Sequence, residues 1–125
     1  MRLSAEEFEE LIAEAVASLP DEIRQKLDNV ALMVEDYPTR RQLRATRLPR
    51  GSTLLGLYEG TPLTGRTISG YNMVMPDRIT IFREPILSAC RTPDQVRQVV
   101  AHTVLHEIAH HFGISDEHLR NIGRY

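Results

Sequence analysis

The chain has 125 residues, of which 42 % are hydrophobic and 26 % are charged, and its formal net charge is −2 at pH 7. This composition is ordinary for a globular protein, and no apolar run approaches the ~18 residues that a membrane span needs. The acidic start of the chain lacks the pattern of a signal peptide, and Cys90 has no second cysteine with which to form a disulfide. We therefore expect one domain over residues 1–125, located in the cytoplasm and without contact to a membrane.

The charges are distributed unevenly along the chain. Residues 1–37 hold ten acidic and three basic side chains, whereas the five arginines that follow before residue 51 have no acid among them. This basic run, TRRQLRATRLPRG, could bind nucleic acid or an acidic partner. It contains no aromatic residue and no recognised nucleic-acid-binding motif, so we interpret it as an arginine-rich connection, at about residues 38–52, that lies in solvent over the acidic N-terminal half. The arginines are Arg40, Arg41, Arg44, Arg47 and Arg50.

Two helices are predicted near the N-terminus. Ser4 and Glu7 form a capping box, and Pro20 ends the apolar repeat that begins behind it. The segment 20–27, PDEIRQKL, has the pattern of a second, short helix with Pro20 in its first turn. The apolar positions of the first helix are Phe8, Leu11, Ile12, Ala15 and Leu19.

The middle of the chain is typical of strands. Residues 29–38, NVALMVEDYP, and residues 52–60, STLLGLYEG, are short apolar runs closed by proline or glycine. Residues 71–75 and 78–82 flank Pro76, which fits the first corner of a tight turn. They predict either a hairpin or one strand with an irregular beginning, and Pro85 ends this stretch.

A long helix is predicted over residues 93–112. Thr92 is placed to cap it, Pro93 suits its first position, and Gln95 completes the capping box. Gly113 suits the left-handed residue that ends a helix. These elements predict an α+β fold in which a small mixed β-sheet packs on the N-terminal helix and on this long helix. The predicted apolar face of the long helix consists of Val96, Val99, Val100, Val104, Leu105, Ile108 and Phe112.

The long helix carries the candidate chemistry near its C-terminal end. His106 and His110 are four residues apart, so their side chains lie one turn apart on the same side and could hold one metal ion. Zinc favours imidazole ligands and keeps an open coordination position in catalytic sites. Glu107 lies beside the pair, where it could take a proton from a water molecule. The spacing is that of the H-E-x-x-H arrangement, in which the glutamate is the general base.

A third metal ligand would come from beyond the helix. Gly113 permits a sharp turn, and Asp116 then arrives as a carboxylate ligand. Asp116 or Ser115 could instead only cap the short helix that follows, and His118 is an alternative third ligand.

Other polar residues near the motif invite a functional interpretation. His102 lies one turn before His106 and could orient it, although packing or a surface position is the simpler interpretation. His111 points about 100° away from His110, which argues against direct ligation. Three tyrosines could donate a hydrogen bond to an oxyanion, but we interpret them as packing or surface residues: Tyr58, Tyr71 and Tyr125.

The segment from His106 to Asp116, HEIAHHFGISD, resembles the H-E-x-x-H-x-x-G-x-x-D signature of minimal bacterial zincin-like metallopeptidases, small relatives of the metzincins. The segments LLGLYEG and PDRITIFREPIL are also similar to that family, so the likeness covers most of the chain. It implies an α+β fold with a cleft between the motif helix and an edge strand. It further implies that His106, His110 and Asp116 bind zinc and that Glu107 is the base. Unlike typical metzincins, the chain has no methionine after the motif.

We therefore expect a zinc metallopeptidase, an endopeptidase that hydrolyses peptide bonds through a metal-activated water with Glu107 as general base. Its peptide or protein substrate could add to an exposed edge strand, within either LLGLYEG or YNMVMPDRITIF. The alternative is a zinc-binding interaction module with weak or no hydrolytic activity, which would serve an unknown protein partner. No nucleic-acid partner is expected.

Overall fold

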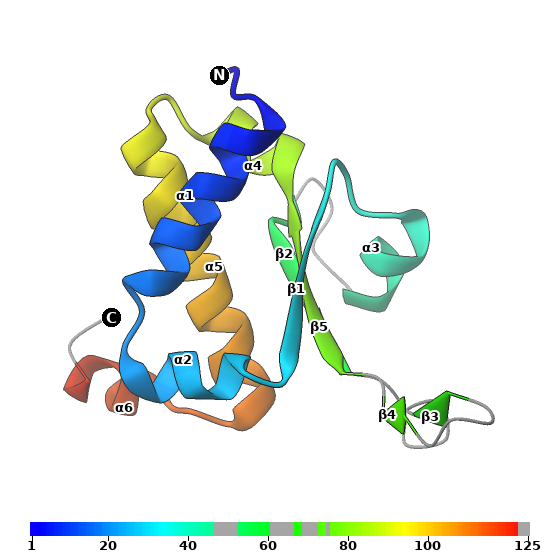
Figure 1. The fold of residues 1–125 in the computed structure, drawn as a ribbon, viewed down its shortest axis with the longest axis vertical. Coiled ribbons are helices and arrows are strands. Elements are labelled where there is room, and N and C mark those ends of the chain that lie inside the picture. The colour runs from blue at the N-terminus through cyan, green and yellow to red at the C-terminus, as the bar shows by residue number, and fades with distance from the viewer. Residues whose placement is uncertain (47–52, 61–66, 69–72, 75, 123–125) are drawn as a thin grey trace.

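A three-stranded mixed sheet stands at the centre of the fold (Figure 1). The computed structural model describes residues 1–46, 53–60, 67–68, 73–74 and 76–122. The central strand β5 (Asp77–Phe82) runs parallel to β1 (Val30–Glu35) and antiparallel to β2 (Gly56–Glu59). Among the described strands, β2 therefore forms one edge of this sheet. The short strands β3 (Thr67–Ile68) and β4 (Met73–Val74) pair only with each other.

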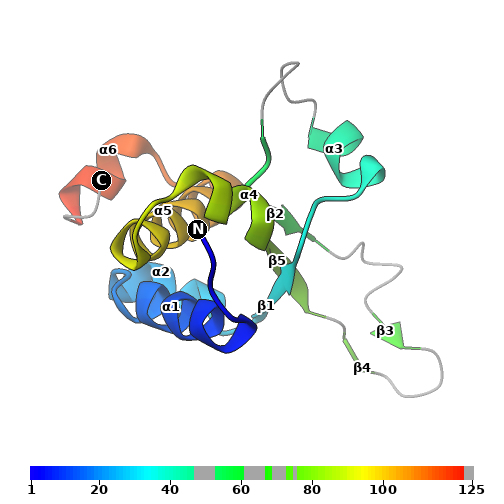
Figure 2. The same ribbon diagram turned by 90° about the horizontal axis from the view of Figure 1, so that it is seen from above.

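Two helices, α1 (Ala5–Ala17) and α5 (Pro93–Phe112), lie side by side on one face of the sheet (Figures 1 and 2). The core lies between them and the sheet, and the α+β class predicted from the sequence is confirmed. No helix in the described ranges is long and apolar enough to cross a membrane. Shorter helices adjoin these two: α2 (Asp21–Leu27), α4 (Arg83–Ala89) and α6 (Asp116–Asn121). The core includes Phe8, Ile12, Ala15, Ile23, Ile79, Ile81, Ile86, Val96, Val100, Val104 and Ile108.

The helix ends follow the sequence signals. Ser4 and Glu7 hydrogen-bond each other reciprocally at the start of α1, at 3.0 Å in both directions. At the start of α5, the Thr92 hydroxyl accepts a hydrogen bond from the Gln95 N–H at 3.1 Å, whereas the Gln95 side chain accepts from the Arg91 N–H at 2.6 Å and so does not complete the predicted capping box. Gly113 ends α5 with φ 68° and ψ 30°, in the left-handed region that glycine enters without steric cost. The chain leaves α5 at the place and in the manner that the motif predicts.

The described part of the arginine-rich connection is helical, with its arginines exposed as expected, but it does not lie over the N-terminal half (Figure 1). Its helix α3 (Arg40–Thr46) starts with a capping box, in which the Thr39 N–H donates to the Gln42 side chain at 2.8 Å and the Gln42 N–H donates to the Thr39 hydroxyl at 3.1 Å. The buried Gln42 amide also donates to Glu59 of β2 at 3.1 Å. α3 therefore packs on the side of the sheet away from α1 and α5 (Figures 1 and 2). Residues 47–52 lie outside the described ranges.

Three other expectations need correction. The described part of residues 71–82 forms no hairpin, because β4 pairs with β3 while β5 pairs with β1 and β2; the alternative of one strand agrees with β5. Pro85 lies in the first turn of α4, a helix that the sequence did not predict. Proline is tolerated there because the N–H groups of the first turn form no hydrogen bonds within the helix. Phe112 is 43 % exposed rather than part of the buried face of α5, and Lys26 Nζ lies 4.8 Å from its ring centroid.

β2 approaches α5 very closely at Gly56. A Cβ atom at this position would lie 2.5 Å from Cγ2 of Thr103 and 3.3 Å from the backbone oxygen of Thr80. The first distance is far below the roughly 3.5–4.0 Å at which non-bonded carbon atoms rest. Glycine at residue 56 therefore lets β2 lie this close to α5 without a shift of Thr103.

Replacing this glycine should separate the strand from the helix. Gly56→Ala is expected to lower the free energy of unfolding by about 1–3 kcal/mol, because the added methyl group overpacks the contact. Thr103→Ser removes the Cγ2 methyl group that the new side chain would meet, so the double variant should recover part of the loss. Urea unfolding of the wild type, both single variants and the double variant measures this. A double variant no more stable than Gly56→Ala would show that the Thr103 contact is not the cause.

Candidate functional site

The motif helix α5 presents three histidines in one row at intervals of a single turn. The ring centroids of His102 and His106 are 4.7 Å apart, and those of His106 and His110 are 6.3 Å apart. Burial, and secondly the neighbouring His106, lower the pKa of His102 from its ordinary value. This shift favours the neutral imidazole, which is the form that binds metals.

The neighbouring row of α5, formed by Thr103, Glu107 and His111, faces β2. Thr103 packs against Gly56. One turn later, Glu107 Oε1 accepts a hydrogen bond from the Tyr58 backbone N–H at 2.7 Å. After another turn, the His111 ring stacks on the Tyr58 ring with centroids 3.9 Å apart and planes inclined by 17°. These contacts hold the strand along two turns of the motif helix.

The Tyr58 amide lies on the free edge of β2. The Leu55 carbonyl accepts a hydrogen bond from the Phe82 N–H at 2.9 Å, so the backbone groups of Leu55 point toward the side of β5. Because these directions alternate along a strand, Gly56 and Tyr58 point their backbone N–H and C=O groups away from β5. Glu107 therefore lies where an added strand would pair with β2.

A cleft of about 460 Å³ opens along this edge. α5 forms one wall of the cleft, the end of α3 forms another, and β2 with the segment before it lies between them. Glu107 and His110 both line the cleft, so the motif brings a carboxylate and an imidazole to the same space. The lining residues are Ala45, Thr46, Leu54, Leu57, Tyr58, Glu107, His110 and His111.

Tyr58 also links the cleft to the central strand. Its hydroxyl donates a hydrogen bond to Asp77 Oδ2 at 2.8 Å, and the same oxygen lies 3.9 Å from Nε2 of His111. The Asp77 side chain is only 14 % exposed. The packing role expected for Tyr58 is thus more specific than the sequence indicated, since this residue joins β2, β5 and α5. Tyr71 and Tyr125 lie outside the described residues.

Asp77 was not among the residues predicted from the sequence, and His111 was considered only as a possible metal ligand. The spacing of Thr103, Glu107 and His111 was the one available signal, because residues four apart share one side of a helix. That signal predicts a common neighbour for the three side chains. It does not say that the neighbour is Tyr58, which depends on the register of β2.

Asp116 lies in the first turn of α6, and Ser115 is the residue that caps this helix by accepting a hydrogen bond from the His118 N–H at 3.1 Å. His118, the alternative third ligand, has its Nε2 2.6 Å from Glu22 Oε2. Within the ranges that the structure covers, no three His, Cys, Asp or Glu side chains gather as a metal site. Asp116 is therefore not brought together with the two motif histidines.

His106 and His110 nevertheless fit a zinc ion. Two imidazoles that share zinc through bonds of ~2.0–2.1 Å have ring centroids roughly 5–6 Å apart, and the separation here is 6.3 Å. Small side-chain rotations would close this difference. The two imidazoles could thus supply two ligands of a zinc ion, and a third protein ligand would have to approach α5 from the segment after Gly113 or from elsewhere.

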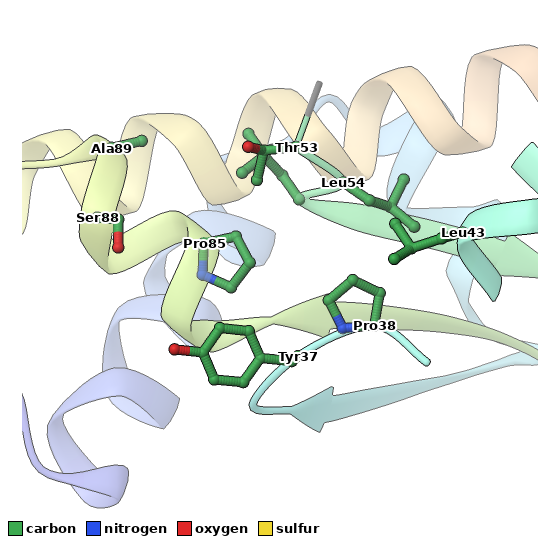
Figure 3. A pocket seen from close by; sticks show the side chains of 9 residues that line it. Tyr37, Pro38, Leu43, Thr53, Leu54, Pro85, Ser88 and Ala89 are labelled. Carbon is green, nitrogen blue, oxygen red and sulfur yellow. The ribbon is translucent and has the colours of Figure 1, made fainter. Parts of the chain in front are cut away.

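Two other hollows lack this combination of groups. The larger, of about 600 Å³, lies beyond Leu54 between α3, α4 and the segment after β1, and the polar side chains among its described lining residues are Tyr37, Thr53 and Ser88 (Figure 3). The other, of about 340 Å³, lies beside His102. Neither is lined by Glu107 or His110, so the cleft along β2 is the candidate functional site.

Comparisons with known proteins point to one family. The family model described as "Zincin-like metallopeptidase" matches residues 27–124. Among solved structures, a conserved hypothetical protein from Thermo thermophilus is similar with a TM-score of 0.57 and 21 % sequence identity, over 88 % of this chain and 94 % of that chain. At this identity, the likeness supports the fold alone. No curated protein matches the chain.

The link between Tyr58 and Asp77 can be tested without disturbing the stacked rings. Tyr58→Phe is expected to lower the free energy of unfolding by about 0.5–1.5 kcal/mol, because the nearly buried Asp77 loses a hydrogen-bond donor. Tyr37→Phe is the matched control, because Tyr37 is 65 % exposed and the same atom is removed from the surface. Urea unfolding of both variants measures the difference. Equal stability of the two variants would mean that the Tyr58 hydroxyl contributes nothing specific.

Proposed function

Because the chain belongs to the zincin-like metallopeptidase family, we propose that it is a zinc-dependent endopeptidase with Glu107 as its general base. The position of Glu107 carries this proposal. Its carboxylate lines the cleft and contacts the free edge of β2, so a base and a strand-pairing edge meet at one place. His110 lines the same cleft and would bring a metal ion next to both.

Zinc would be held by His106, His110 and Asp116. When bound, zinc supplies Lewis acidity, which makes water an effective nucleophile near neutral pH. The spacing and ring separation of the two histidines support their role. For Asp116 the support is its spacing in the motif, three residues after the left-handed Gly113, and its carboxylate would have to move toward the two histidines to reach the metal.

Glu107 would take a proton from the attacking water and deliver it to the leaving amine. The Tyr58 N–H holds Oε1 and thereby orients the carboxylate. A carboxylate has two oxygens with about four acceptor positions, so the second oxygen can accept the proton while the first stays anchored. Because this hydrogen bond takes up the Tyr58 N–H, a substrate would pair with β2 beside it, and the base would stay fixed next to that substrate.

A peptide or protein substrate would add to β2 as a further strand. β5 is paired on both sides, which leaves β2 as the edge beside α5. Strand pairing requires residues on both sides of the cleaved bond, which suits cleavage within a chain. The cytoplasmic location and the absence of a nucleic-acid partner stay predictions.

A second candidate is a zinc-binding interaction module without hydrolytic activity. The hydrogen bond between Glu107 and Tyr58 favours it, because a carboxylate that fastens a strand to a helix has a structural use even if it moves no proton. The two candidates share the metal ligands and differ only in what Glu107 does.

Glu107→Gln separates the two candidates. The glutamine oxygen can still accept the hydrogen bond from Tyr58, so the fold should remain, but the side chain can no longer serve as a base. Incubation of zinc-loaded wild type and variant with a mixed peptide library, read by mass spectrometry, should show cuts by the wild type that fall at least about a hundredfold in the variant. Glu117→Gln is the control: the Glu117 side chain on α6 is exposed, and this variant should cut the library like the wild type. Identical profiles for the wild type and Glu107→Gln would favour the interaction module.

Metal content tests the ligands separately from activity. The purified protein should bind about one zinc ion per chain, and His106→Ala or His110→Ala should weaken binding by at least about tenfold. Asp116→Ala should do the same, whereas His118→Ala should not. Isothermal titration with zinc measures each affinity. A loss with His118→Ala and none with Asp116→Ala would exchange their assignments.

A further inference from the structure

The exposed arginines of α3 stand beside the candidate cleft. Arg40, Arg41 and Arg44 are all exposed, and none of them forms an ion pair within the part of the chain that the structure describes. Glu59, the acidic residue that α3 contacts through Gln42, is engaged by that amide and by Arg78, whose Nε lies 3.5 Å from Glu59 Oε1. The positive charge of α3 is therefore not neutralised by the described part of the sheet beneath it.

Arg41 lies on the cleft side of this helix. Ala45 and Thr46 line the cleft, and Arg41 precedes Ala45 by four residues, so the two share one side of α3. Gln42 faces the sheet, and Arg40 is two residues before it, which places Arg40 on the opposite, outward side. Of these arginines, Arg41 is thus the one that flanks the cleft one turn from its lining.

The acidic group of the cleft is the proposed base. Among the described residues, Glu107 is the only acidic side chain that lines the cleft. It lies on α5, across β2 from the wall that α3 forms. A second carboxylate brought in by a ligand would therefore be attracted toward Arg41 and repelled by Glu107, which sets its position along the cleft.

We infer that the cleft takes extended peptides with an acidic side chain close to the bond that is cleaved, and that Arg41 recognises this side chain. This inference rests on the proposed peptidase function and names its substrate class. One helical turn is about 5.4 Å, roughly the advance of two residues in an extended strand, so Arg41 stands about that far along α3 from Ala45 in the cleft wall.

A peptide fits these observations better than a nucleic acid does. The α3 sequence RRQLRAT contains no aromatic residue on which a base could stack. The outer edge of β2 carries backbone N–H and C=O groups of the kind that pair with another peptide backbone, and its Tyr58 N–H is already donated to Glu107, so a peptide would pair beside that hydrogen bond. Of the arginines noted in the sequence, Arg41 therefore acquires a role that does not need nucleic acid.

Binding to the zinc-loaded Glu107→Gln protein tests the inference without cleavage. The probes are two fluorescein-labelled decapeptides of alanine and valine that differ only in carrying two central glutamates or two glutamines. Fluorescence anisotropy at about 50 mM salt measures the affinity. The acidic probe should bind about two- to fivefold more tightly for each ion pair that a probe glutamate forms with the protein. Adding Arg41→Gln should abolish the preference, whereas Arg40→Gln, which removes the same charge from the outward side, should retain it. Thermal unfolding verifies that both variants are folded.

Each outcome decides a different question. Equal binding of the two probes, or a preference that Arg41→Gln does not change, overturns the inference even if the wild type cleaves peptides. If the preference depends on Arg41 but the zinc-loaded wild type cleaves neither probe, the result supports acidic recognition and counts against the peptidase function. A single-stranded DNA oligonucleotide that displaces the acidic probe at equal concentration, with loss of binding in both Arg40→Gln and Arg41→Gln, would reassign α3 to nucleic acid and overturn the inference.

Discussion

The close packing of β2 on α5 is the constraint on which the candidate site depends. At Gly56 the strand comes so near to Thr103 that no side chain fits between them. This proximity brings the Tyr58 amide within 2.7 Å of Glu107 and lets the Tyr58 ring stack on His111. A strand held farther away would leave Glu107 without its partner and would widen the cleft. The absence of a side chain at one position therefore determines the geometry of the polar groups beside it.

Local features of the fold could be predicted from the sequence, whereas strand pairing could not. The ends of α1 and α5 follow from Ser4, Thr92 and Gly113, because each residue acts on backbone groups within a few positions of itself. α3 begins at the same kind of signal, Thr39 with Gln42, although the charge of the surrounding arginines favoured a solvated connection. The hairpin was wrong because β5 pairs with β1, far earlier in the chain, and no local pattern records such a partner.

The candidate site shows the same division. The spacing of His106, Glu107 and His110 indicates the chemistry, since a helix converts sequence distance directly into angle. The links of Tyr58 to Glu107, His111 and Asp77 were not predictable, because they depend on the register between β2, β5 and α5. A cleft made by three elements exists only once these elements are assembled.

Two neighbouring rows of side chains on α5 have different surroundings: one row contacts β2, and the other carries the histidines proposed to bind zinc. Thr103, Glu107 and His111 face β2, while His102, His106 and His110 form the row beside them. Because Glu107 follows His106 directly, the H-E-x-x-H spacing necessarily puts the proposed base on the row that holds the strand. The proposed base, the two motif histidines and the edge of β2 are therefore fixed relative to one another by a single helix–strand contact. Arg41, proposed to recognise the substrate, belongs to a different element, α3. Substitutions in α3 could therefore change the substrate preference without disturbing the contact between β2 and α5.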